Sequence, residues 1–594
     1  MSKIIFLTFF CFLLFLSFSY PQDKEAFNRD LDLAQNLIGA GRSSEAIEIL
    51  EKLKKLSPEN QQLFSLLSRA YLDTKSYPEF EEHLKNWLKK YPQDWRAWAQ
   101  LGDLYLKIEK KPLADESFKK ALDVAPDSVE PYQIIATTYL LNQESEKAIE
   151  TYKSGIKKSG NQPLLLKSLA ELYEISGDNA SALEYYFYWA EEDTSKYGEI
   201  ERKIMRLIES GEKSEELEKG LKKGITLLPK KSLGYKLYGD LLLKRGKLSQ
   251  AFELFKTADL LSGSNGENLL LFAQTCLKQH SYELSLKTSQ YLESSCHRVE
   301  CAIQSRFISG FSLTGLGKYT EALSVYQKIA QDYPIREIQA QAYFQTGEIS
   351  LEFLNKNDEA LIWYRKILTL KDTSPYSGAL IKSGKIYLLK DQLDSARFFF
   401  EETLKDPKAE PVYEEFNFYL AEIDFYQGDF EKAIEAYQKF LNDFPKGLFV
   451  NNTLERLNLI KDNLSMNRPF LKDFSTALLF IYQGNFVEGE KLLDKIIQAK
   501  VLTLSDAVWM EKSSLLRKKN EFKASISEYQ SLIDKYPQSL YLPLALKSIG
   551  DVYLEELKET QKAKESYELF LKRFPSSLYA PEVREKLKGL IGGN

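Results

Sequence analysis

The stretch WAQLGDLYLKIEKKPLADESFKKALDVAP, from Trp98 to Pro126, decides the fold of this chain. Its first half places large apolar residues three or four positions apart, at Trp98, Leu101 and Tyr105. The second half keeps that spacing at Ala114, Phe118 and Ala121. The pattern predicts two amphipathic helices, each with one apolar stripe. Small residues such as Gly102 let the two backbones approach, and large rings fill the space beside them.

This pattern recurs at a fixed interval. Pro58, Pro92 and Pro126 are spaced by 34 residues. The residues at the Ala114 position follow the same interval: Ala46, Phe80, Ala114, Ala148 and Ala182. The pattern weakens over residues 197–228, which keep helical spacing but lose the small residues, and later continues at intervals of 36 to 38 residues. Such a period predicts stacked helix pairs that cover each other's apolar faces.

Stop signals stand between the two helices of many units. Glycine, which accepts a left-handed backbone, is expected to end the first helix at Gly246, Gly317, Gly428 and Gly484. Asn520 is the expected substitute in a later unit, because asparagine tolerates the same conformation.

The third unit resembles the tetratricopeptide-repeat signature position for position. The resemblance implies an all-α superhelix of about fifteen helix-turn-helix repeats, two of them degenerate. The last repeats, with Tyr536-Pro537 and Phe574-Pro575, are similar to those of periplasmic and outer-membrane proteins of this family. These include the lipoprotein of the β-barrel assembly machine and the Tol-Pal coordinating protein.

The N-terminus predicts export. Lys3 precedes the apolar run IIFLTFFCFLLFLSF of residues 4–18, and a small-x-small step follows at Ser17 and Ser19. The run is short for a membrane span, which needs about 20 residues. We therefore expect a signal peptide over residues 1–19, with a periplasmic or outer-membrane-associated product. An uncleaved N-terminal anchor is the alternative.

The repeats predict four segments after the signal. An N-terminal array covers residues 23–263 and is degenerate around 197–228, and a central array covers 266–447. A joint helix is expected over 448–466. A C-terminal array over 467–594 is expected to end in a polar capping helix that shields the last unit.

The sequence carries no recognisable catalytic constellation. GLGKYT at 315–320 falls where each unit turns from first to second helix, so it is interpreted as a helix cap and not as a phosphate-binding loop. Three histidines leave little scope for general-base or metal chemistry. We therefore predict no enzyme, and no catalytic, cofactor or metal residues. The interleaved charges, with a formal net charge of -5, argue against a nucleic-acid partner.

One cysteine cluster is open to three readings. Cys296 and Cys301 flank His297, with Cys276 and His280 in the preceding unit. Plain buried thiols or a Cys296–Cys301 disulfide are favoured. A metal site is the third reading, but the Cys-x4-Cys spacing by itself is not a zinc spacing.

Partner binding is predicted on the first helices of the ninth to twelfth units. Residues just off their packing positions form an apolar wall in the concave groove: Phe307, Phe311, Phe344, Ile381, Leu388, Phe418 and Phe425. Exposed apolar patches mark partner sites. The alternative is a shifted register, in which these rings pack between neighbouring units. An acidic series, Asp103, Glu171, Asp240, Glu348 and Glu422, either lines the groove or forms a solvated polar face.

These features predict a scaffold of the cell envelope that binds proteins or extended peptides in its groove, with other envelope or outer-membrane complex components as possible partners and no small-molecule substrate. The alternative is a peptidoglycan- or glycan-associated factor accessory to an enzyme. That alternative needs Trp and Tyr in the groove, whereas Trp98 and Trp189 stand at packing positions.

Overall fold

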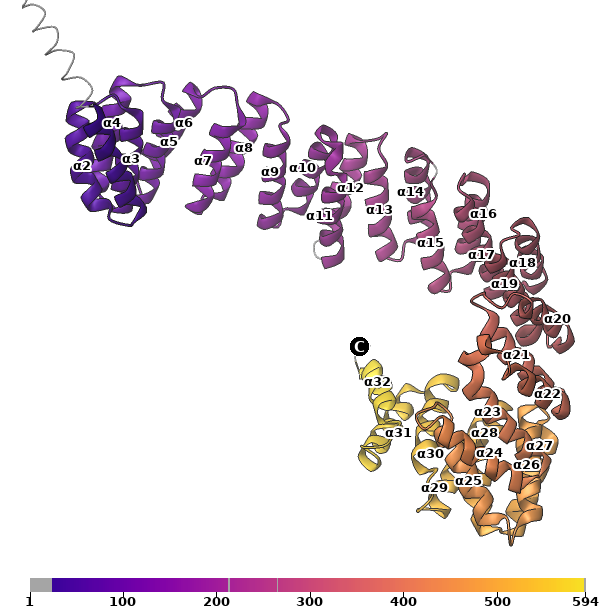
Figure 1. Cartoon of the computed structure of the whole chain (residues 1–594). Coiled ribbons are helices and arrows are strands. Elements are labelled where there is room, and N and C mark those ends of the chain that lie inside the picture. The colour runs from indigo at the N-terminus through magenta and orange to yellow at the C-terminus, as the bar shows by residue number, and fades with distance from the viewer. Residues whose placement is uncertain (1–23, 212–213, 264, 592–594) are drawn as a thin grey trace, which may run out of the picture. The chain divides into compact units, whose positions relative to one another are not determined.

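The structure, a computed structural model, describes residues 24–211, 214–263 and 265–591. Within these residues the chain is built of helices joined by short turns, and none of them lies in a β-strand (Figure 1). The all-α prediction is confirmed. The predicted signal peptide over 1–19 lies outside the described residues.

The described residues form two compact units. Unit 1 runs to Cys276 and includes Ser294–Cys301, whereas unit 2 comprises Leu277–Glu293 and the described residues from Ala302 onward. After a helix over residues 24–39, the helices of unit 1 are α2 (Ser43–Leu56), α3 (Gln61–Asp73), α4 (Tyr77–Lys90), α5 (Trp95–Lys107), α6 (Lys111–Val124), α7 (Val129–Leu141), α8 (Ser145–Ser159), α9 (Pro163–Ser176), α10 (Asn179–Glu192), the 3-10 helix η1 (Thr194–Lys196), α11 (Tyr197–Ser210), α12 (Ser214–Leu227), α13 (Ser232–Lys244), α14 (Leu248–Leu261) and α15 (Glu267–Lys278).

The remaining helices lie wholly or mainly in unit 2. They are α16 (Tyr282–Ser295), α17 (Val299–Gly315), α18 (Tyr319–Asp332), α19 (Arg336–Glu348), η2 (Ile349–Phe353), α20 (Asn357–Leu368), α21 (Tyr376–Leu389), α22 (Leu393–Thr403), η3 (Pro407–Val412), α23 (Tyr413–Gln427), α24 (Phe430–Asp443), α25 (Val450–Asn463), α26 (Arg468–Tyr482), α27 (Phe486–Ala499), α28 (Leu502–Lys518), α29 (Phe522–Lys535), α30 (Leu542–Asp551), η4 (Val552–Glu556), α31 (Thr560–Arg573) and α32 (Ala580–Ile591). Taken in order, the described helices make fifteen pairs of a first and a second helix, with α25 and α32 left over.

Helix ends follow the local sequence. Asp94 accepts a hydrogen bond from the backbone N–H of Ala97, 3.1 Å away, and so caps α5. The turn between paired helices contains a residue with positive φ. The predicted glycines and Asn520 fill this position, as at Gly246 with φ +70°. Elsewhere an ordinary residue takes it, such as Glu109 with φ +59°.

Pairs interlock through small and large residues. A Cβ added to Gly102 of α5 would lie 2.5 Å from the ring of Phe118 on α6, so only glycine fits the crossing. Gly347 meets the ring of Tyr364 in the same way, and Gly550 meets Tyr567. The predicted interlocking of small and large residues is confirmed.

Two repeats contain one extra residue, and the structure absorbs it as a π-helical turn. From the small residue of the first helix to that of the second, the spacing is 12 between Gly102 and Ala114 but 13 between Gly347 and Ala360. The added residue falls in η2, which has π-helical hydrogen bonding. The other 13-residue unit, around Gly550, has the π-helical turn η4 at the same place. A π-bulge accommodates an insertion without shifting the flanking helices.

The degenerate segment forms two helices but packs differently. α12 lies against α10, the second helix of the preceding pair. A Cβ on Gly224 would lie 2.0 Å from the ring of Phe187, and one on Gly220 would lie 2.7 Å from Leu183. The small residues missing from the first helix, α11, are therefore found on α12, where they face the previous second helix.

The predicted joint helix forms as α25, and it is covered on both sides. It packs against α24 and α28, and Leu457 and Ile460 are buried. α26 in turn packs against α23, so helices far apart in the chain share one apolar core. The predicted capping helix is α32, whose Val583 is buried against the last pair.

No helix within the described ranges combines the length and the apolar character needed to cross a membrane.

Candidate interaction surface

A carboxylate directly follows the small residue of several first helices and is bound from two sides. Glu348 follows Gly347 and accepts a hydrogen bond of 2.5 Å from the hydroxyl of Tyr364 on the second helix. The next first helix supplies Lys382, whose Nζ lies 3.1 Å from the same carboxylate. The hydroxyl and the carboxylate satisfy each other, and the lysine supplies the compensating charge. We call this site the carboxylate position.

The arrangement recurs near the C-terminus of unit 2. Asp551 accepts a hydrogen bond of 2.7 Å from the Tyr567 hydroxyl, and Lys586 lies 2.8 Å away. Burial opposes ionisation of Asp551, but hydrogen bonds from Lys547, Lys586 and Tyr567 hold its pKa below the ordinary value. Burial and this bond together raise the pKa of Tyr567.

Glu422 occupies the carboxylate position of α23 and is the most buried example, with a side chain 4% exposed. The hydroxyls of Tyr437 and Tyr426 donate to it, and Arg456 of α25 lies 3.1 Å away. In unit 1, Glu171 pairs with Lys203 of the next first helix at 2.9 Å.

The exception is Phe311, at the carboxylate position of α17. It follows Gly310 and is 37% exposed. Tyr326, the counterpart of Tyr364, is fully buried, and its hydroxyl makes no bond of hydrogen-bond geometry. Burial raises the pKa of this hydroxyl, and the Thr314 side chain lowers it slightly. The Thr314 hydroxyl, however, donates to the carbonyl of Gly310. The Phe311 ring stands edge-on to Tyr326, with 6.0 Å between the ring centroids. An exposed aromatic ring therefore stands where the next pair has the acceptor Glu348.

Three further residues of the predicted wall lie one turn earlier on consecutive first helices. Phe307, Phe344 and Ile381 are spaced by 37 residues and are partly buried. The ring centroids of Phe344 and Tyr364 are 5.8 Å apart. A Cβ added to Gly378 of the next first helix would lie 2.9 Å from the Phe344 ring. Phe344 thus fills the space between two successive first helices, as the alternative register stated above expects, whereas Phe307 contacts Phe311 and Tyr326 of its own pair. A role of these residues in partner binding stays a prediction.

The other three residues of the predicted wall are not exposed. Leu388, Phe418 and Phe425 are 1%, 6% and 0% exposed. Phe418 and Phe425 belong to one core with residues of α26 and α28. Phe418 contacts Tyr437 and Phe440 of α24, its partner helix, and stacks on Phe449. The ring of Phe425 contacts Phe430 and lies under Arg456 of α25.

The acidic series is also not a free acidic surface. Glu171 and Glu348 are paired with cations of the following first helix, and Glu422 is paired with Arg456 of the joint helix α25. Asp103 pairs with Lys107 at 2.5 Å. Asp240 differs, because burial raises its pKa to about 6 while its neighbour Lys236 pairs with Glu201. A repeat alignment could have located the exception, since Phe311 stands in register with Glu348 and Glu422.

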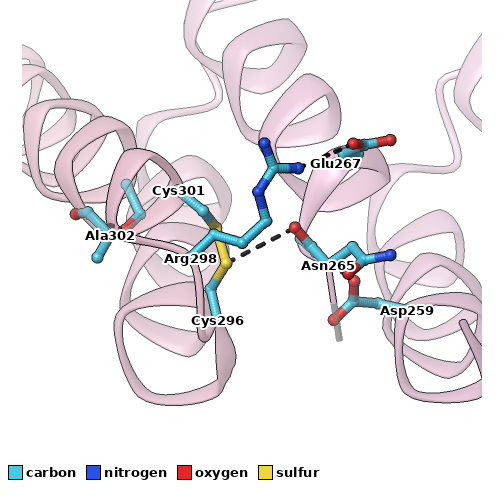
Figure 2. The surroundings of a disulfide bond; sticks show 9 residues. Asp259, Asn265, Glu267, Cys296, Arg298, Cys301 and Ala302 are labelled. Carbon is cyan, nitrogen blue, oxygen red and sulfur yellow. Dashed lines mark hydrogen bonds and ion pairs between the residues drawn. A yellow bond between two sulfur atoms is a disulfide. The ribbon is translucent and has the colours of Figure 1, made fainter. Parts of the chain in front are cut away.

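The cysteine cluster contains a disulfide. Cys296, which directly follows α16, is bonded to Cys301 in the first turn of α17 (Figure 2). The Cys296 sulfur lies 3.6 Å from the carbonyl oxygen of Asn265, and Arg298 pairs with Glu267 at 3.0 Å. Cys276 is a buried thiol whose pKa burial raises to about 11. Among the described residues, no three His, Cys, Asp or Glu side chains are grouped to hold a metal ion.

The following matches were found among known proteins. Models of the tetratricopeptide repeat match residues 31–104, 96–128, 304–334, 417–447 and 548–577. No curated protein matches the chain.

Solved structures with similar helices include a MamA protein, 22% identical over 29% of this chain and 94% of that one, with a TM-score of 0.23. A Naa15/Naa10 complex bound to HypK-THB is 13% identical over 96% of this chain and 97% of that one, with a TM-score of 0.26. The P58(IPK) TPR domain is 17% identical over 71% of this chain and 100% of that one, with a TM-score of 0.18. The sequence-based prediction of tetratricopeptide repeats is confirmed for these matched segments, and the helices between them are paired in the same way.

Proposed function

We propose that the chain is an exported scaffold of the cell envelope that binds a protein or an extended peptide at the surface centred on Phe311. Tetratricopeptide repeats typically bind proteins or peptides. The observation that carries the proposal is the pairing of an exposed Phe311 with the unsatisfied hydroxyl of Tyr326.

The unpartnered hydroxyl of Tyr326 lowers the stability of the free protein. A buried polar group without a partner costs about 1–3 kcal/mol. The tenth and twelfth pairs avoid the cost with Glu348 and Glu422, whereas the eleventh pair has Lys385 at this position and Phe400, a ring without a hydroxyl, on its second helix. A local departure from an otherwise consistent pattern is expected where function requires it. An aromatic ring at this site offers apolar contact area to an incoming side chain.

The surroundings of Phe311 define the partner's chemistry. The ring centroids of Phe307 and Phe311 are 6.5 Å apart, so Phe307 extends the aromatic surface. The next pair provides the carboxylates Glu348 and Glu352, and Lys382 of α21 pairs with both. A peptide with one apolar anchor and polar flanking residues fits this surface.

Two features support a location in the envelope. The segment 1–19 has the pattern of a signal peptide. The Cys296–Cys301 disulfide suits an oxidising compartment, because such bonds are rare in the cytosol. The partners on this proposal are components of envelope or outer-membrane complexes, as the likeness of the last repeats to periplasmic proteins of this family suggests.

Site-specific photocrosslinking in intact cells tests the proposal. A photoreactive phenylalanine analogue at position 311 should give a discrete adduct with one envelope protein. The same analogue at Lys385, the carboxylate position two units later, serves as the matched control and should give none.

The analogue can also be placed at Gln304, an exposed residue of the same helix, where it should form the adduct when position 311 is phenylalanine. The Phe311→Glu substitution should then abolish the adduct at Gln304. Equal labelling at positions 311 and 385 would contradict the proposal. So would an adduct at Gln304 that survives Phe311→Glu in a folded protein.

A further inference from the structure

The second helices carry a solvent-facing position two residues after their small packing residue. In eight pairs this position is glutamate: Glu48, Glu82, Glu116, Glu150, Glu184, Glu253, Glu435 and Glu565. In the consecutive helices α20 and α22 it holds Ile362 and Phe398, which are 54% and 66% exposed. We call these two exposed apolar side chains, at a position that eight pairs give to glutamate, the Ile362/Phe398 patch, and exposed apolar patches mark interaction sites.

A groove runs beside this patch. Between α20 and α22 it has a volume of about 750 Å³, with Tyr376, Leu380 and Tyr387 of α21 among its lining residues and Phe398 on its α22 wall. A second hollow of about 530 Å³ on the other side of α20 contains Ile362. Arg365 lines both, so the two hollows adjoin, and their volumes fall in the range of about 300–1,000 Å³ typical of binding clefts.

The charges on the two walls are opposite at equivalent positions. Three and four residues after Ile362, α20 carries Arg365 and Lys366. Three and four residues after Phe398, α22 carries Glu401 and Glu402. All four are exposed. The arrangement is complementary to itself: one copy of the surface presents acid where another presents base.

We propose that this face binds a second copy of the chain around a two-fold axis that runs parallel to α20 and α22, between them. Such an axis places α20 of one copy opposite α22 of the other at the same height. Ile362 then faces Phe398, and Arg365 and Lys366 face Glu401 and Glu402, twice in each dimer. A two-fold interface requires a self-complementary patch of this kind.

Sedimentation equilibrium of the full chain over a concentration series tests the proposal. The wild type is expected to reach twice the monomer mass. Phe398→Glu should raise the dissociation constant at least about 10-fold, because it places an unpaired charge in the apolar centre. The side chain is mostly exposed, so the variant should fold, which circular dichroism checks.

Charge reversal separates this interface from other causes of association. Arg365→Glu with Lys366→Glu should weaken the dimer, and adding Glu401→Lys with Glu402→Lys should restore it. Glu435→Lys, at the corresponding surface position of α24, is the matched control and should leave the dissociation constant unchanged. A wild type that remains monomeric up to about 100 μM would overturn the proposal, and so would a fourfold variant that associates no better than the twofold one.

Discussion

The two units use the same helix pair but connect the pairs differently. In unit 1, packing and ion pairs join neighbours along the chain, as between Glu171 and Lys203. In unit 2, side chains also reach across long separations. Gln483 donates to the carbonyl of Leu388, 95 residues earlier, and Tyr541 donates to Glu455, 86 residues earlier.

The difference begins where the chain departs from strict pairing. α25 has no second helix, so the helices that follow do not simply continue the stack: α26 packs against α23 and α28 against α25. When each pair touches only its neighbours, stability is approximately a sum of local terms. The helices α23 to α28 of unit 2 should therefore unfold more cooperatively than the helices of unit 1.

The largest expected effect comes from removing a ring in the shared core of unit 2. Phe474 of α26 is 1% exposed, so Phe474→Ala should cost about 3–5 kcal/mol. Because α26 packs against α23, hydrogen exchange should also accelerate in α23. Phe118→Ala, at a ring of unit 1 that is 2% exposed, is the control, and its effect should stay within neighbouring pairs. Equally local effects in both units would remove the distinction.

The carboxylate position sharpens the comparison with a second pair of variants. Arg456→Met leaves Glu422 buried and unpaired, which should destabilise unit 2 by about 3–5 kcal/mol. Lys203→Met leaves Glu171 without this cation, but the Glu171 side chain is 37% exposed. This variant should therefore destabilise unit 1 by less than about 1 kcal/mol. Guanidinium unfolding of both variants measures the contrast. Similar losses would show that burial does not set the strength of these pairs.

Asp240 and Asp551 should respond to pH in opposite directions. The pKa of Asp240 is raised to about 6, so its own contribution to the stability of unit 1 is greatest below the ordinary value of 3.8 and falls by about 3 kcal/mol as the pH rises from there to about 6. The pKa of Asp551 is lowered, so its contribution is present above 3.8 and is lost as the pH falls. Unfolding against pH, with Asp240→Asn and Asp551→Asn as references, tests both signs. A wild-type profile parallel to that of Asp240→Asn would contradict the first.

The smallest expected effect lies in a turn of unit 1. Glu109 adopts φ +59°, a conformation that costs a residue with a Cβ about 1 kcal/mol relative to glycine. Glu109→Gly should therefore raise the melting temperature slightly. Glu116→Gly, inside α6, should lower it, since glycine weakens a helix interior by about 0.5–1 kcal/mol. A lower melting temperature for Glu109→Gly would show that the turn is not strained.

Much of the fold was predictable, because it depends on local spacing. The interval between small residues located the pairs, and Gly246 or Asn520 marked the turns. The joint and capping helices were predicted near α25 and α32. The packing of α12 against α10 was not predicted, because the small residues Gly220 and Gly224 stand on the second helix of this pair and not on the first.

The candidate surface was predictable only in part. The apolar character of Phe418 and Phe425 was evident, but their burial was not, because it depends on Phe449 and Arg456, which lie outside the repeat pattern. The roles of Glu348 and Glu422 depend on hydroxyls and cations from two other helices, which spacing alone does not bring together.

The most direct test of the surface at Phe311 is the free energy of unfolding of Phe311→Glu. The new carboxylate would stand where Glu348 stands in the next pair and accept a hydrogen bond from the Tyr326 hydroxyl. The variant should therefore be more stable than the wild type by about 1 kcal/mol. A loss of stability of that size or more would show that Phe311 is held by packing, and would contradict a ring kept exposed for a partner.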